Sequence, residues 1–222
     1  MYDGGLLGAR LLGLYKSRGE YILFLDSDQV LKTDTLSRCI RECKEQKSDM
    51  VALGEDVYER KTFLQWLFYC DRKVIETVKD LDPMTSAILP RFFKRHILVE
   101  AVRKIPKSII STVGGPDHAI LYYETYRLSK KVSIIPHAVL HMEPASLTHL
   151  IRKSYRWGKT GTTAKQIPVY GYLMKSKERF RTGLFTRGLY WESIGSILLL
   201  LCKGIPYTIG YVFGLYFSDR RK

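Results

Sequence analysis

An unbroken apolar run, Tyr21–Leu25, most restricts the folds that are open to this chain of 222 residues. Its length suits a strand rather than a helix, and continuous hydrophobicity is typical of a strand that is covered on both faces. Helix-like patterns lie on either side of it, over 4–17 and 33–47, and a second strand-like run follows at 49–54. This alternation predicts an α/β fold with a mostly parallel sheet flanked by helices.

Signals for helix ends extend this pattern along the chain. Thr62 and Gln65 have the spacing of a capping box, which predicts a helix over 63–79. Pro116 is suited to the first turn of a helix, here over 116–130. The other expected elements are strands over 132–135 and 138–141 and a helix over 146–157 that ends at Gly158.

The formal net charge is +14, which implies a partner rich in negative charge. The excess is unevenly placed, because residues 1–145 carry 22 basic and 19 acidic side chains, whereas residues 146–222 carry 14 and 3. The second part therefore has a net charge of +11. We expect three regions: a globular core over 1–145, a basic helical segment over 146–188 and a hydrophobic membrane-associated tail over 189–222.

The hydrophobic tail carries one charged residue, Lys203, between Ser193 and Phe217. About 20 apolar residues suffice to cross a bilayer, but Lys203 and Pro206 interrupt the centre, where a charge is costly and a helix kinks. Basic residues on both sides of the tail favour a cytoplasmic location for both ends, and hence a shallow hairpin of two helices over one tilted span. A buried helix pair that completes a soluble core is the third alternative.

The charge alone would also fit nucleic-acid binding, but the apolar tail does not. We therefore expect an anionic membrane surface, and no nucleic acid, as a partner. The four cysteines lack the paired spacing of a zinc site, and no signal peptide precedes them, which indicates reduced cytosolic thiols. They are Cys39, Cys43, Cys70 and Cys202.

Two acidic residues follow directly on the buried strand. Asp26 and Asp28, separated by Ser27, are placed at its carboxyl end, where open α/β sheets bind ligands. Carboxylates so spaced in a turn can converge on a hard divalent cation and its bound phosphates. An isolated Asp-x-Asp is a common surface turn, but its position at the edge of the core favours a binding role.

The segments Gly8–Gly13 and Gly19–Asp28 resemble the core signature of the family 2 glycosyltransferases, in a prokaryotic membrane-associated branch. These inverting enzymes have the Rossmann-like GT-A fold and take a sugar from a nucleotide-sugar donor. The resemblance implies that Arg10, Asp26 and Asp28 bind the donor, the two aspartates through Mn²⁺ or Mg²⁺, and that Gln29 assists. Leu11 stands where the family has Asn, so no polar contact is expected there.

The segment Gly114–Ile120 resembles the family's Gly-Glu-Asp motif at the start of a helix, with Pro116 in place of Glu. The resemblance implies that Asp117 is the catalytic base, which takes the proton from the acceptor. A helix N-terminus favours the ionised form of a carboxylate, which suits this role. An ordinary acidic residue in the first turn of a helix is the alternative.

Residues 139–159 resemble the end of the family's catalytic region, where a strand that ends in His is followed by a basic and aromatic helix. The resemblance implies that His141 completes the metal site; simple hydrogen bonding is the alternative. Arg152 and Arg156 share one face of that helix and can clamp the donor diphosphate or a lipid phosphate. A solvated basic face on lipid headgroups is the competing interpretation.

The resemblance also implies nucleotide-binding strands before residue 1, so we expect an N-terminally truncated domain or a second polypeptide that supplies the missing half. The whole pattern predicts a glycosyltransferase at the cytoplasmic face of the cell membrane. Its expected acceptor is lipid-linked or a surface polysaccharide. The alternative is a catalytically degenerate GT-A domain that serves as a membrane-bound scaffold.

Overall fold

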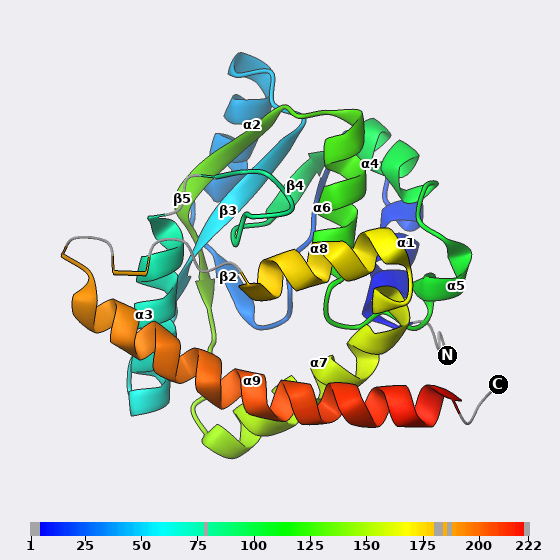
Figure 1. Ribbon diagram of the computed structural model, residues 1–222. Coiled ribbons are helices and arrows are strands. Elements are labelled where there is room, and N and C mark those ends of the chain that lie inside the picture. Colours follow the sequence, from blue (N-terminus) through cyan, green and yellow to red (C-terminus); the bar gives the residue numbers. More distant parts are fainter. Residues whose placement is uncertain (1–4, 78–79, 180–183, 186–187, 220–222) are drawn as a thin grey trace.

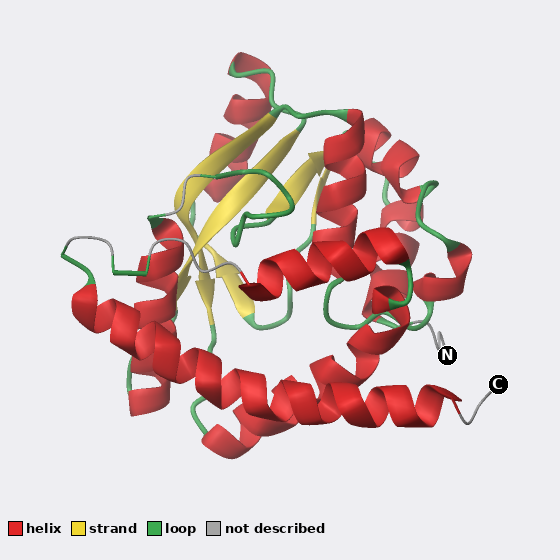
Figure 2. Ribbon diagram, in the orientation of Figure 1, coloured by secondary structure: helices red, strands yellow, loops and turns green. Residues whose placement is uncertain are grey.

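The computed structural model describes residues 5–77, 80–179, 184–185 and 188–219 and has a mixed sheet with helices on both faces (Figures 1 and 2). The strands are β1 (Tyr21–Leu23), β2 (Gln29–Leu31), β3 (Met50–Val57), β4 (Pro90–Lys94) and β5 (Val132–His141). The helices that surround the sheet are α1 (Leu6–Lys16), α2 (Thr35–Glu45), α3 (Phe63–Glu76), α4 (Arg95–Val102), α5 (Lys107–Ile110) and α6 (Asp117–Leu128). The C-terminal part forms α7 (Leu147–Lys165), α8 (Pro168–Arg179) and α9 (Tyr190–Asp219).

The sheet has the strand order β1-β4-β3-β5-β2. Among these strands only β3 and β5 pair in parallel, and the other three pairings are antiparallel. The α/β class is thus confirmed, but the expectation of a mostly parallel sheet is wrong. The periodicity of a segment reports its burial and not its direction, and it gave no sign that β4 inserts between β1 and β3 in the opposite sense.

The apolar run that contains β1 is covered on both faces, as predicted, although β1 lies at an edge of the sheet. Ile22 and Phe24 belong to the larger hydrophobic cluster, which includes residues of α1, α4 and α6. Tyr21 and Leu23 pack against the smaller cluster, which contains two cysteines of α2. β1 ends at Leu23, and Phe24 after it is still buried, so the acidic turn follows a well-packed segment.

The two strands expected over 132–141 form the single strand β5, which bends at Pro136 and His137. The register with β3 shifts at this point, and a Cβ on Gly54 would lie only 2.9 Å from the His137 nitrogen. His137 has a φ of 53°, in the left-handed region. The bend redirects the second half of β5, so that its last residue, His141, pairs with Gln29.

The capping box that opens α3 is confirmed. The Thr62 hydroxyl accepts a hydrogen bond from the Gln65 backbone, and the Gln65 side chain accepts one from the Thr62 backbone. The helix ends at Glu76, ahead of the expected residue 79, which lies outside the described residues. The helix expected over 116–130 is α6, in which Pro116 precedes the first helical residue as N-cap.

Helix α7 continues through Gly158, where the sequence predicted its end. A Cβ on Gly158 would lie 2.0 Å from the Tyr207 carbonyl oxygen of α9, and one on Gly210 would lie 2.1 Å from the Tyr155 carbonyl oxygen of α7. These glycines therefore serve close contact between the two helices rather than termination of α7.

Helix α9 is continuous, with Pro206 inside it, so the hairpin expected for the tail is wrong. Proline removes one hydrogen bond of the helix. Next to it, the backbone of Tyr207 contacts α7 at Gly158, and this contact supports the continuous path of α9. By length and composition alone, Tyr190–Tyr216 is the one segment among the described residues that is able to cross a membrane, with a mean hydropathy of 1.6.

The close contact predicts opposite effects for two helix glycines. Gly158→Ala should lower the free energy of unfolding by about 2 kcal/mol, because the methyl group collides with the α9 backbone. Gly204→Ala, where a Cβ meets nothing within 4 Å, should raise it by about 0.5–1 kcal/mol. Urea unfolding of the two variants measures the difference, and equal effects would contradict the backbone contact.

Candidate active site

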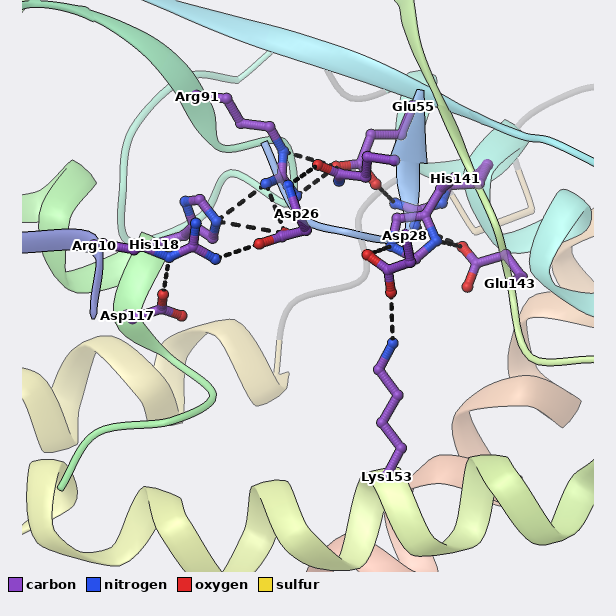
Figure 3. A network of polar contacts seen from close by, with 12 residues as sticks. Arg10, Asp26, Asp28, Glu55, Arg91, Asp117, His118, His141, Glu143 and Lys153 are labelled. Carbon is purple, nitrogen blue, oxygen red and sulfur yellow. Dashed lines mark hydrogen bonds and ion pairs between the residues drawn. The ribbon is translucent and has the colours of Figure 1, made fainter. Parts of the chain in front are cut away.

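A cavity of about 950 Å³ lies between the sheet and the helices α7 and α9. It is lined by six of the seven side chains that the sequence analysis singled out, and Figure 3 shows five of these, all except Arg156. Those six are Arg10, Asp26, Asp28, Asp117, His141 and Arg156. Arg152 is exposed on α7 and does not line the cavity.

Asp26 lies in the turn after β1 and is held by three basic side chains. The Arg10 guanidinium bonds its Oδ1, Arg91 Nη1 lies 3.0 Å from its Oδ2, and His118 Nε2 lies 3.7 Å from the same oxygen. Burial opposes ionisation, but the nearby His118, the hydrogen bond from Arg10 and the charges of Arg10 and Arg91 outweigh it and lower the pKa of Asp26. Asp26 is therefore a fixed negative charge.

Asp117 begins α6 and is 1% exposed. Its Oδ2 bonds Arg10 Nε, so one guanidinium joins Asp117 to Asp26. The sequence named these three residues separately, and the structure brings them together. The next residue, His118, is buried with its Nδ1 unpartnered, and burial is the main cause that lowers its pKa and favours the neutral ring.

Arg91 continues the charge network toward the other end of the cavity. Its Nη2 lies 2.7 Å from Glu55 Oε1, while Glu55 Oε2 lies 2.6 Å from Arg72 Nη1. Arg72 Nη2 in turn lies 2.7 Å from Glu143 Oε1. Burial would raise the pKa of Glu143, but His141, whose Nδ1 lies 3.3 Å from Oε1, and the charge of Arg72 lower it to about 2.

Asp28 and His141 meet because β2 and β5 pair at their ends. The Met142 amide donates to the Asp28 carbonyl over 2.8 Å, and His141 Nε2 lies 3.7 Å from Asp28 Oδ1. The other carboxylate oxygen, Oδ2, lies 3.2 Å from Lys153 Nζ. Figure 3 shows Lys153 reaching from α7 to this carboxylate.

A divalent cation fits part of the set that the sequence analysis proposed. Asp28 and His141 offer an oxygen and an imidazole nitrogen close together, a combination suited to Mn²⁺. Asp26 is instead engaged by arginines through both oxygens. In the described part of the chain, the one group of three such ligands within 4.8 Å is elsewhere, at Asp56, Glu76 and His137.

The basic helix meets the cavity through Arg156, one of the two expected arginines, and through Lys153, which was not expected. Lys153, between the two predicted arginines, points inward, and its Nζ lies 5.1 Å from the centre of the Trp157 ring. Trp157 lines the cavity, whereas Tyr155 contacts Phe213 of α9. The expected shared face of Arg152 and Arg156 is therefore divided between solvent and the cavity edge.

Besides Lys153, sequence reasoning missed four charged residues of the network. Glu55 follows the buried part of β3 at its carboxyl half, so the rule that identified Asp26 could have found it. Arg91 near the start of β4 and Arg72 within α3 carry no comparable signal. Glu143 was noted only as part of the segment after His141. These charged residues pair with partners that are distant in the sequence, so only the tertiary structure shows which of them are paired.

Residues 2–104 match the model of the family described as Glycosyl transferase family 2. This match confirms the resemblance noted for Gly8–Gly13 and Gly19–Asp28, so the matched segment is similar to the glycosyltransferases of family 2. Arg10, Asp26, Asp28 and Arg91 lie within the matched segment, whereas Asp117 lies beyond it. No curated protein sequence matches the chain.

Among solved structures, the chain is similar to two from Staphylococcus aureus. One is described as the crystal structure of S. aureus TarS, with 14% identity and a TM-score of 0.46, covering 90% of this chain and 36% of that one. The other, S. aureus TarS 1-349, has 13% identity and a TM-score of 0.47, covering 94% and 62%. The chain thus spans less than two thirds of either structure.

Proposed function

We propose that the chain is an inverting, divalent-metal-dependent glycosyltransferase that moves a sugar from a nucleotide-sugar donor to a lipid-linked or surface-polysaccharide acceptor. One observation carries the proposal. Arg10 joins the acidic turn at Asp26 to the buried Asp117 in one cavity, and Arg10 and Asp26 lie in the segment that matches family 2. The site of action is the cytoplasmic face of the cell membrane.

The chain's own residues suit direct displacement at the anomeric carbon. The acceptor hydroxyl attacks that carbon, the bond from the sugar to the donor diphosphate breaks, and the hydroxyl proton passes to Asp117. Arg10 orients Asp117, while Arg156 and Lys153 supply positive charge on the opposite wall for the diphosphate. Asp28 and His141 would hold the cation, which neutralises charge on the departing diphosphate when bound.

Asp28→Ala tests the metal role. We expect transfer from a panel of nucleotide sugars in Mn²⁺ to fall by about 100-fold or more, because the cation loses its carboxylate ligand. Calorimetry should also show that donor binding no longer depends on Mn²⁺. Asp34→Ala, at an exposed carboxylate before α2, is the matched control. Undiminished transfer by Asp28→Ala would contradict the metal role.

One observation favours the scaffold alternative. Lys153 and the arginines already pair with Asp28 and Asp26, so these two carboxylates have basic partners without a ligand. A chain that bound vesicles but no nucleotide diphosphate, with or without Mn²⁺, would support a degenerate domain over an enzyme.

A further inference from the structure

Helix α9 exposes its large apolar side chains and buries small or polar ones, which is the opposite of what is expected for a helix that completes a soluble core. Twelve of its described side chains are exposed; none of them is charged, and eleven are large and apolar or aromatic. Most of them are spaced three or four residues apart and the rest adjoin these, so together they form one stripe along the helix. The eleven are Tyr190, Trp191, Ile194, Leu198, Leu201, Ile205, Ile209, Val212, Phe213, Leu215 and Tyr216.

The opposite face of α9, turned toward the protein, is formed mainly by small or polar residues. Ser193 and Ser196 are fully buried, and the Ser196 hydroxyl donates to Asp71 over 2.6 Å. Gly210 meets the α7 backbone. The only charged residue in the middle of the helix, Lys203, lines the cavity and lies 4.3 Å from the centre of the Phe68 ring. Large apolar groups therefore face outward where a core helix would bury them.

Helix α7 limits how α9 can be placed relative to a bilayer. The two backbones touch at Gly158, Gly210 and Gly214, so α9 does not separate from α7 without losing its buried contacts. On α7, Arg152, Arg156 and Lys159 are exposed. If α9 crossed the hydrocarbon layer, the charged side chains of α7 would be placed inside that layer, which costs much free energy.

We propose that α9 lies flat in the surface of an anionic bilayer, with its exposed stripe in the acyl region and the basic residues of α7 among the headgroups. The charge of residues 146–222, net +11, complements anionic lipid. Aromatic residues at both ends, Trp191 and Tyr216, suit the polar boundary of the membrane. This docking mode is independent of whether the cavity is catalytic.

Vesicle flotation of the full chain tests the surface. Leu201→Lys should weaken binding to phosphatidylcholine vesicles with anionic phosphatidylglycerol by about tenfold or more, because a charge replaces an exposed leucine that would otherwise enter the acyl region. Leu36→Lys is the matched control, since Leu36 is 48% exposed against 56% for Leu201 but lies on α2 at the opposite edge of the molecule (Figure 1). The control should bind like the unchanged chain.

Two results would overturn the proposal. Equal binding by both variants would exclude the stripe as the lipid-contacting surface. A chain that does not bind vesicles, but whose self-association in sedimentation is lost in Leu201→Lys, would show that the stripe is covered by a second copy.

Depth measurements distinguish a flat helix from a spanning one. Cysteines at Ile194, Ile205 and Val212, introduced singly with Cys202→Ser and labelled with bimane, should be quenched to similar extents by nitroxide lipids of one depth. A helix that crosses the bilayer would instead place Ile205 much deeper than the other two, which would contradict the flat orientation.

Discussion

Asp117→Asn is expected to lower the rate of sugar transfer by about two to four orders of magnitude while the donor still binds. An amide oxygen can accept the hydrogen bond from Arg10 that the carboxylate accepts now, so the local packing is preserved. The amide cannot take the acceptor proton, however, and that step is lost. Steady-state kinetics should therefore show the change in kcat, with little change in the KM for the nucleotide sugar.

Glu124→Gln is the matched control for this prediction. Glu124 lies on the same helix, is equally buried and bonds Tyr170 and Arg127, but does not line the cavity. Its replacement should leave kcat within about threefold of the unchanged chain. Comparable activity of Asp117→Asn and Glu124→Gln would exclude Asp117 as the base, whatever the donor affinity.

Arg91→Met should lower the free energy of unfolding by about 3–5 kcal/mol, the largest stability effect that we expect from a single replacement. Arg91 and Glu55 are each only 11% exposed, and Arg91 also bonds Asp26. Removal of the guanidinium leaves Glu55 and the partly buried Asp26 with fewer partners, and each carboxylate loses part of the interaction that offsets its desolvation. Urea unfolding followed by circular dichroism measures the loss.

The contrasting replacement is Arg38→Met, which removes an ion pair with Asp34 on the surface of α2. Exposed pairs of this kind contribute under about 1 kcal/mol. The double variant Arg91→Met with Glu55→Gln should recover part of the loss, because the second change removes a carboxylate that had become underpaired. Equal costs for Arg91→Met and Arg38→Met would show that the buried network adds no stability.

Local patterns identified the elements around the site, because those elements depend on nearby residues. The capping box at Thr62 and the apolar strand at Tyr21 are decided within a few positions, and both are confirmed. The direction of β4 and the continuity of α9 depend on distant partners. Gly158 is the sharpest case: a glycine that is typical of a helix end instead provides room for the Tyr207 backbone.

The candidate site shows the same division. Asp26 could be named because it follows a buried strand, where ligands are commonly bound. Asp117 could be named only through the resemblance of its segment to a family motif. Arg91 and Lys153 could not be named, since the role of each in the site depends on the carboxylate that it faces across the cavity. A basic helix contributes Lys153 rather than Arg152 because of how α7 is rotated against α9.

The packing of α7 on α9 also has a kinetic consequence. Helix α7 supplies Lys153, Arg156 and Trp157 to the cavity, so the surface that we propose to dock on lipid is continuous with one wall of the cavity. An acceptor anchored in the same bilayer would reach this wall by lateral diffusion in two dimensions. Its effective concentration at the cavity would then depend on its density in the membrane rather than on its solubility in water.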